Sequence, residues 1–405
     1  MGDKKAMEEA KFDSYSSVKE SMEDPKLHLA PFTPPKRSIW SPKTWTRRAW
    51  LWLGSGLVLI VIVVVGAVVG VKATKKSDHS IGTGPYPNYA KLNYALVDTY
   101  SPSSFLSQFN YYDGEDPAAG FVQYSSEEEA SQRNLTYVSS SANSVIIRAD
   151  NSPDATNGRH SIRLHSKKQY GPGLFIFDVK HTPYGCGSQP AISLADPSNW
   201  PENGEIGIMR GFSGDNWNWM NIFTARGCSM DQVKRKMLGS LSYYGDCSVA
   251  RTDSVNGCMA QAVIEKDPGF YYTIGKLYNQ QGGGIVAMEY RSEGIRIWQF
   301  ARGQIPQDIS LYGQEQKTPD PKTWGPPLAD YPSTKCDMAS HFRNQSIIVN
   351  IDFCGHGPYS NWGEGLLCAM QNPQHSTCQS YVAANASAFD NTYWEFGGFQ
   401  IYQAV

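Results

Sequence analysis

Short apolar runs separated by turn-forming residues dominate the chain beyond residue 96. The runs are rich in Val, Ile, Phe and Tyr, and clusters of Gly, Pro, Asn and Ser lie between them, as is typical of β-strands joined by turns. No amphipathic helical pattern of comparable length appears there. Many short strands at close spacing predict an all-β domain, a sandwich of two antiparallel sheets. The predicted strands are residues 144–148, 160–165, 174–179, 285–290, 295–300, 346–353 and 399–402.

Two neighbouring runs predict a hairpin. Residues 285–290 and 295–300 are both apolar and β-branched or aromatic, and the segment 291–294, Arg-Ser-Glu-Gly, separates them. A glycine at the end of a short polar linker favours a tight reversal of the chain. We therefore expect two adjacent antiparallel strands joined by a four-residue loop.

One apolar stretch has a different character. Residues 49–71 contain no charged side chain, and at about 1.5 Å per residue a helix of this length crosses roughly 30 Å of hydrocarbon. A cleaved signal peptide is the alternative, but 48 residues precede the stretch, and its apolar run is longer than that of a signal peptide. The pattern therefore predicts one transmembrane signal-anchor helix.

The predicted span divides the chain into four parts. Residues 1–48 mix charges, Ser and Pro with few aliphatic residues, which favours a disordered cytosolic tail. Residues 49–71 are the span, residues 72–95 form a short polar stalk, and residues 96–405 have the composition of one domain. A domain of this size is usual for a two-sheet β architecture.

Cysteines and glycosylation sequons indicate the orientation in the membrane. All eight cysteines lie beyond the span, an even number of the kind that forms disulfides in an oxidising compartment, although their pairing cannot be read from the sequence. The sequons at Asn134, Asn344 and Asn385 also lie on that side. Basic residues are more frequent before the span than after it, which favours a cytosolic N-terminus. These features predict a type II protein whose domain is lumenal or extracellular.

Charge and motif content exclude several function classes. The net charge is -2, so no strong basic field indicates a nucleic-acid partner. The eight histidines show no metal-ligand spacing, and no G-x-S-x-G motif frames a serine nucleophile. We expect neither a metal nor another cofactor.

The segment 200–211, Trp-Pro-Glu-Asn-Gly-Glu-Ile-Gly-Ile-Met-Arg-Gly, resembles the active-site strand of glycoside hydrolase family 16, which carries G-E-I-D-I-x-E-G. Further blocks of this chain are similar to fungal endo-β-1,3(4)-glucanases of the laminarinase type and follow in the family's order. They are residues 109–122, 185–187, 227–230, 282–289, 301–306, 319–325 and 393–395. The resemblance implies a concanavalin A-like β-jelly roll with a β-glucan ligand held in a cleft across its concave sheet.

The same resemblance gives roles to three positions of the active strand. Glu205 stands at the nucleophile position, Gly207 at that of the assisting aspartate and Arg210 at that of the acid/base glutamate. Residues 205 and 210 of a regular strand face opposite sides, so the motif requires a β-bulge between them. Retaining hydrolysis needs two carboxyl groups, and a guanidinium has no proton to donate at working pH. We therefore expect Arg210 to pair with Glu205 and hydrolysis to be impaired.

Other positions around the same site also depart from the family pattern. Gln189 and Ser193 stand where the family has tryptophans, and Phe223 replaces a histidine. Four tryptophans are candidates to line the sugar site, although large aromatic residues of a β-sandwich also belong to the core. They are Trp200, Trp217, Trp219 and Trp298.

Three functions remain open at this point. The first is a membrane-anchored protein that binds β-glucan or assists its assembly without cleaving it, as fungal type II proteins with similar domains act in cell-wall construction. The second is an active endo-β-1,3(4)-glucanase or transglycosylase in which Asp215 or Glu202 supplies the proton. The third is a surface interaction module without a sugar ligand.

Overall fold

The computed structural model describes residues 80–405 except 154, 244, 250–256, 264–271, 356–361 and 363–366. Within these ranges no helix is long and apolar enough to cross a membrane. The predicted tail, residues 1–48, and the predicted span, residues 49–71, lie outside the described residues.

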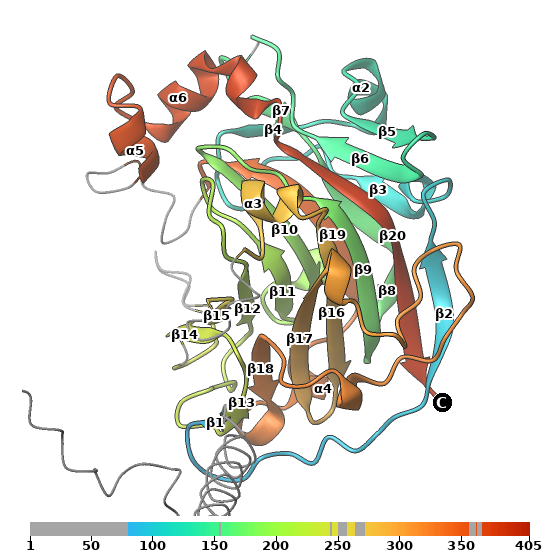
Figure 1. The fold of residues 1–405 in the computed structure, drawn as a ribbon. Coiled ribbons are helices and arrows are strands. Elements are labelled where there is room, and N and C mark those ends of the chain that lie inside the picture. The colour runs from blue at the N-terminus through green and yellow to red at the C-terminus, as the bar shows by residue number, and fades with distance from the viewer. Residues whose placement is uncertain are drawn as a thin grey trace, which may run out of the picture. The chain divides into compact units, whose positions relative to one another are not determined.

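Two antiparallel sheets form the domain (Figure 1). The first sheet contains, in spatial order, β14 (Ser240–Tyr243), β15 (Cys258–Gln261), β12 (Trp219–Phe223), β11 (Glu205–Arg210), β10 (Ser188–Ala195), β19 (Gln345–Phe353), β8 (Arg163–Tyr170) and β3 (Phe109–Tyr111). The second contains β18 (Ala329–Pro332), β17 (Gly294–Ala301), β16 (Gly284–Arg291), β9 (Gly173–His181), β20 (Tyr393–Ala404), β6 (Ser144–Arg148) and β5 (Thr136–Ser139), with β2 (Tyr94–Tyr100) also paired to β20. The expected all-β sandwich is confirmed.

The remaining elements are short. Two small pairs join β1 (Ser80–Ile81) to β13 (Arg235–Lys236) and β4 (Val122–Tyr124) to β7 (Arg159–Ser161). In the described part of the chain the α-helices are α2 (Glu127–Gln132), α3 (Gly275–Gln280), α4 (Met338–His341), α5 (Leu367–Gln371) and α6 (Cys378–Ala384). Single 3-10 turns lie at Leu106–Gln108, Pro197–Asn199, Arg302–Gln304, Pro321–Thr323, Ser333–Lys335 and Ala386–Phe389.

The apolar runs of the sequence coincide with strands. The run 144–148 is β6 and the run 285–290 lies inside β16, whereas the run 160–165 is divided between β7 and β8. The predicted hairpin of β16 and β17 is present, but its loop is shorter than expected. Arg291 and Gly294 are still paired, so only two residues form the turn, and Gly294 has a φ of 149° that favours glycine.

Strand β16 is apolar on both faces because both are covered. Val286 and Met288 belong to the main core between the sheets. Ile285 and Ala287 point the other way, into a second cluster on the outer side of the sheet. The connection after β17, drawn in orange, runs across that outer face, and Ile309 packs in this cluster (Figure 1). A continuous apolar run therefore marks a strand buried on both sides.

Disulfides fasten loops at both ends of the first sheet. The bonds are Cys186–Cys368, Cys228–Cys336, Cys247–Cys258 and Cys354–Cys378. All eight cysteines are paired and none is free, which confirms the disulfides expected from the even count.

The segment before β2 is part of the folded unit. Sequence composition assigns residues up to 95 to a polar stalk, yet a compact unit extends from Ser77 to Val405. The Tyr86 hydroxyl donates a 2.9 Å hydrogen bond to Asp330 Oδ2, and that of Tyr89 donates one of 3.3 Å to Oδ1. Tyr86 and Tyr89 thus attach this segment to the second sheet, a role that its polar composition did not indicate.

Candidate functional site

Strand β11 contains the expected bulge. Gly207 pairs with Ser193 and Met209 with Ile192, so Ile208 is an extra residue in this register. Ile208 and Met209 are both fully buried in the core between the sheets. The extra residue returns Arg210 to the outer side of the sheet, where Glu205 and Gly207 also lie. We call this side, with its three residues 205, 207 and 210, the Glu205 face.

A buried asparagine holds the bulge in place. Asn218 is fully buried; its Oδ1 accepts a 2.9 Å hydrogen bond from the Arg210 N–H and its Nδ2 donates one of 3.1 Å to the Ile208 carbonyl. Its own N–H donates to Thr273 Oγ1 at 2.7 Å. The side chain thus supplies the partners that a bulge removes from the regular ladder.

Glu205 has a partner at each carboxylate oxygen. Arg210 Nη2 forms an ion pair and hydrogen bond with Oε1, and Trp200 Nε1 donates a 3.0 Å hydrogen bond to Oε2. The side chains of Arg210 and Glu205 are 23% and 13% exposed, so the pair is largely buried but still reaches solvent. The guanidinium also lies 5.4 Å from the centre of the Phe223 ring. The pairing of Arg210 with Glu205 is as the sequence predicts.

Asn221 occupies the space that a side chain at position 207 needs. The two residues are cross-strand partners, and a Cβ on Gly207 would lie 2.2 Å from Asn221 Oδ1 and 3.0 Å from Arg210 Nε. Asn221 is fully buried, and neither its Oδ1 nor its Nδ2 has a hydrogen-bond partner among the described residues. Arg210 Nε likewise lacks one there. The Asn221 amide thus fills the space beside Gly207, and its oxygen and nitrogen remain without hydrogen-bond partners among the described residues.

The other substituted positions lie beside this cluster on the first sheet. Ser193 is the partner of Gly207 on β10, and Phe223 is the partner of Glu205 on β12. Gln189 lies further along β10 opposite Asp352, and its Nε2 donates a 3.1 Å hydrogen bond to the Gly355 carbonyl. Burial raises the pKa of Asp352 well above its usual range, and the neighbouring Asp116 carboxyl raises it further. Asp352 therefore holds its proton more tightly than a solvent-exposed carboxyl.

Of the two alternative proton donors, only Asp215 is held in place. Its Oδ2 accepts a 2.8 Å hydrogen bond from Trp219 Nε1, and Trp219 is the cross-strand partner of Arg210. Burial raises the pKa of Asp215, an effect that the Trp219 hydrogen bond partly opposes. Glu202 is exposed in the loop before β11. Asp215 is the carboxyl near Arg210 with a tendency to retain its proton.

The four candidate tryptophans do not form one group. Trp200 contacts Glu205, and Trp219 lies opposite Arg210 but is almost fully buried. Trp200 and Trp217 are 41% and 38% exposed, which is unusual for such large rings. Trp298 lies in β17 of the second sheet, buried, and donates to the Gly325 carbonyl at 3.0 Å. The structure therefore does not bring Trp298 together with Glu205.

Sequence reasoning missed Asn218 and Asn221, the residues that shape the site most directly. Neither belongs to a motif. Spacing could have indicated Asn221. Once the bulge is assigned, the residue directly opposite Gly207 on the next strand must point to the same side of the sheet. The hydrogen bonds of Asn218 to Arg210 and Ile208 depend on side-chain geometry, which the spacing of residues cannot predict.

Comparisons with known proteins give a consistent result. The family described as XgeA-like, catalytic GH16 domain, matches residues 109–402. A probable glycosidase of Schizosaccharomyces pombe is 35% identical over 78% of this chain and 71% of its own length. An endo-1,3(4)-beta-glucanase of Arthroderma benhamiae is 33% identical over 79% and 67%.

Solved structures agree with these relatives. Laminarinase 16A from Phanerochaete chrysosporium, with two β-glucans in its donor and acceptor sites, is 35% identical with a TM-score of 0.65 and covers 77% of this chain and 100% of its own. An elongating family 16 beta-1,3-glucosyltransferase is 30% identical with a TM-score of 0.65 and covers 76% and 100%.

Proposed function

The chain belongs to the XgeA-like group of glycoside hydrolase family 16, a family of β-glucan-active enzymes, and from this premise we propose that its domain binds β-glucan across the Glu205 face without cleaving it by two-carboxyl chemistry. The observation that carries the proposal is the ion pair between Glu205 and Arg210. Retaining hydrolysis requires one carboxylate that attacks and a second carboxyl that protonates the leaving oxygen. Here the second position supplies a permanent cation that is bound to the first.

The Glu205 face still has the chemistry that a sugar ligand needs. Trp200 and Trp217 expose large ring surfaces on which pyranose rings can stack. The partly exposed side chains of Arg210 and Glu205 supply donors and acceptors for hydroxyl groups. Because the family's stacking positions are Gln189 and Ser193 here, we expect weak binding, on the order of 0.1–1 mM for an oligosaccharide, or about 4–5.5 kcal/mol.

A second candidate function is an active β-1,3(4)-glucanase or transglycosylase. The names of the relatives favour it over the non-catalytic interpretation, since they are described as glycosidase, endo-1,3(4)-beta-glucanase and beta-1,3-glucosyltransferase. One feature of the site supports it as well. Asp215 has a raised pKa and a fixed orientation beside Trp219, as a general acid requires. In that case Asp215, not residue 210, protonates the leaving group.

The sequence supports a further proposal on location. We propose that residues 49–71 anchor the protein as a type II membrane protein and that the domain acts on cell-wall glucan outside the cytosol. Asn134 and Asn344 are exposed and suit glycan attachment, whereas Asn385 Nδ2 donates to the Tyr381 carbonyl at 2.9 Å. Peptide mapping after deglycosylation should find the first two occupied and Asn385 unmodified. Finding all three sequons unmodified in the native host would contradict this placement.

Turnover of laminarin and lichenan by the full chain distinguishes the two functions. The non-catalytic proposal expects no release of reducing sugar and no transfer products. Steady release that disappears both in Glu205→Gln and in Asp215→Asn would establish the enzyme instead. Titration with β-1,3 and β-1,4 gluco-oligosaccharides tests binding separately. If nothing binds at about 10 mM, well above the expected dissociation constant, the domain is the non-sugar interaction module.

A further inference from the structure

The second sheet carries a cavity of its own, which includes residues of β17. Its volume is about 650 Å³, within the range of about 300–1,000 Å³ typical of small-ligand sites. Its walls come from the end of β17, from the connection that follows it, and from Leu238. None of the residues that line it belongs to β10, β11 or β12.

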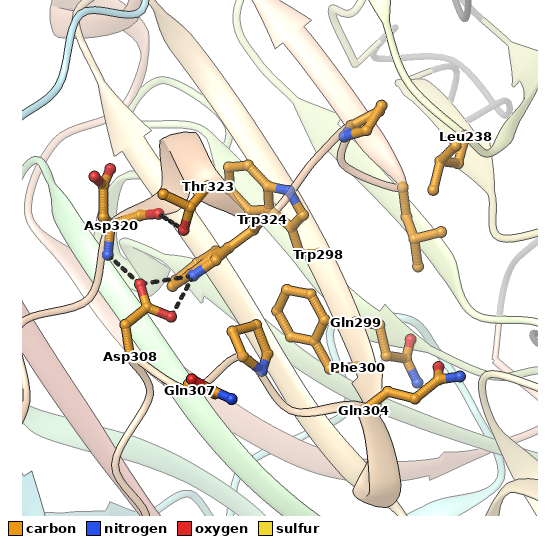
Figure 2. Close-up of a pocket in the computed structure, with 13 residues that line it drawn as sticks. Leu238, Trp298, Gln299, Phe300, Gln304, Gln307, Asp308, Asp320, Thr323 and Trp324 are labelled. Carbon is orange, nitrogen blue, oxygen red and sulfur yellow. Dashed lines mark hydrogen bonds between the residues drawn. The ribbon is translucent and has the colours of Figure 1, made fainter. Parts of the chain in front are cut away.

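Three aromatic rings form one side of the cavity in fixed orientations (Figure 2). Trp324 lies edge-to-face with Trp298, their ring centres 5.4 Å apart, and with Phe300 at 5.6 Å. Trp298 is anchored by its hydrogen bond to Gly325, while Trp324 and Phe300 are half-buried. Their rings need no rearrangement to receive a ligand, so little conformational entropy is lost on binding.

Polar groups surround these rings. Both oxygens of Asp308 accept from Trp324 Nε1 at 3.0 Å, and Oδ2 also accepts from the Asp320 N–H at 2.6 Å. A carboxylate has about four acceptor sites, so capacity remains for a ligand hydroxyl. Gln304 and Gln307 line the cavity with exposed side chains that make no hydrogen bond to another described residue. Each amide can both donate and accept.

We propose that this cavity is a second carbohydrate site, which binds a short segment of the same β-glucan. Flat ring surfaces beside a carboxylate and free amides suit a pyranose, which has apolar faces and hydroxyl groups around its edge. A purely apolar ligand would leave Asp308 and the amides desolvated without partners. The choice of glucan rests on the function proposed for the Glu205 face. The cavity shares no lining residue with that face, although its Gln299 accepts a 3.4 Å hydrogen bond from Asn218.

Two sites on one domain change what the protein recognises. A polysaccharide that reaches both binds the second intramolecularly, so affinity for the polymer exceeds that for a short oligosaccharide by about 10²-fold or more when the geometry permits. Weak individual sites are then sufficient to retain the protein on a glucan matrix. An oligosaccharide too short to span both sites gains nothing.

Tryptophan indole N–H signals can report on the two sites separately. The full chain is labelled with ¹⁵N-tryptophan and titrated with laminarihexaose and cellohexaose, and Trp324→Phe and Trp200→Phe identify the two reporter peaks. We expect the Trp324 peak to shift with saturation. The double variant Gln304→Ala/Gln307→Ala should weaken the affinity at this reporter by about tenfold, because two hydrogen bonds to the ligand are lost. Tyr312→Ala removes another aromatic ring that is 41% exposed in the same connection but does not line the cavity, and it should have no effect.

The outcomes separate this proposal from the one for the Glu205 face. A shift at Trp324 that the glutamine variants leave unchanged, or no shift there at about 10 mM while the Trp200 peak responds, overturns the second site. A response at Trp324 alone supports the second site and overturns glucan binding at Glu205. If neither peak responds to either oligosaccharide, both proposals are wrong.

Discussion

Two glutamate–arginine pairs of this domain have the same chemistry but very different surroundings. Glu289 in β16 is 1% exposed; its Oε2 pairs with Arg296, while its Oε1 lies 3.6 Å from Arg291 Nη1 and accepts a 2.8 Å hydrogen bond from the Tyr94 hydroxyl. Glu205 is partly exposed and has Arg210 and Trp200. The first pair is enclosed by partners, whereas the second lies on an open face.

The groups that surround the two pairs also differ in whether their polar atoms have partners. Around Glu205, Asn221 Oδ1, Asn221 Nδ2 and Arg210 Nε are buried without hydrogen-bond partners among the described residues. Around Glu289, Arg296 also lies 4.1 Å from the centre of the Tyr89 ring. Buried polar groups of folded proteins are normally satisfied. The unsatisfied atoms beside the Glu205–Arg210 pair are therefore an exception that the proposed binding function would explain. From this comparison we expect Glu289 to stabilise the fold and Glu205 to contribute mainly to the proposed site.

Removing the two carboxylate charges should therefore have unequal effects on stability. Glu289→Gln leaves the buried Arg296 guanidinium without its charge partner, while Arg291 keeps its pair with Glu293. The change should lower the free energy of unfolding by about 3–5 kcal/mol. Glu205→Gln should cost about 1 kcal/mol, because the amide oxygen can still accept a hydrogen bond and Arg210 still reaches solvent. Equilibrium denaturation with the disulfides intact measures both. Equal losses in the two variants would show that Glu205 is a structural residue as well.

The pH dependence of stability provides a second test near Glu289. Burial raises the pKa of Asp330 from 3.8 to about 6, and the hydrogen bonds from Lys236 N, Tyr86 and Tyr89 only partly oppose it. The folded state then binds the proton more tightly than the unfolded state. Asp330 contributes stability below pH about 4 that is lost as pH rises to about 6, roughly 3 kcal/mol in all.

The variant Asp330→Asn isolates this contribution. His165 and His181 have pKa values lowered by burial to about 4, so they change stability with pH in the opposite sense. The difference between the wild-type and variant unfolding free energies should vary from pH 4 to 6, whereas the histidine contributions cancel in it. A constant difference across that range would contradict a raised pKa for Asp330.

The fold was predictable to a greater extent than the site. Alternation and turn residues identified β6, β16 and β17, and the spacing from Glu205 to Arg210 required the bulge that β11 contains. The second sheet was harder to interpret. Trp298 pairs with Ala287 and contacts Trp324, both of the outer cluster, whereas its neighbour Gln299 donates to the Thr273 carbonyl. A sequence pattern assigns opposite faces but does not reveal that a distant connection covers the outer one. Asn221 escaped prediction for a similar reason, since its role depends on an empty position across the strand.

Restoring the missing carboxyl groups tests how the Glu205 face differs from a catalytic one. Gly207→Asp alone should destabilise the protein by about 1–3 kcal/mol through overpacking, because its Cβ would lie 2.2 Å from Asn221 Oδ1. Arg210→Glu alone should give little hydrolysis. Gly207→Asp/Asn221→Ala/Arg210→Glu relieves the crowding and places both carboxyl groups, and we expect measurable laminarin cleavage only in this combination, as members of one catalytic unit are non-additive.

Two controls make the restoration experiment decisive. Asn221→Ala in the wild-type background should relieve no crowding and produce no activity. Adding Glu205→Gln to the triple variant should abolish any activity gained. If Gly207→Asp is as stable as the wild type, the conclusion that Asn221 occupies the space needed by a side chain at position 207 is wrong.

The smallest expected effect concerns glucan affinity. Arg210→Ala removes a donor to the ligand and leaves Glu205 with the hydrogen bond from Trp200. A sugar that covers the face then removes water from a carboxylate without its charge partner, which costs binding free energy. We expect affinity at the Trp200 reporter to fall by about fivefold to tenfold, or about 1–1.4 kcal/mol. Lys168→Ala breaks a surface ion pair with Asp98, with the lysine side chain 54% exposed, and should leave the affinity unchanged. A gain in affinity in Arg210→Ala would mean that the ion pair competes with the ligand for Glu205, and Glu205 would then be the sugar-binding group while Arg210 restrains it.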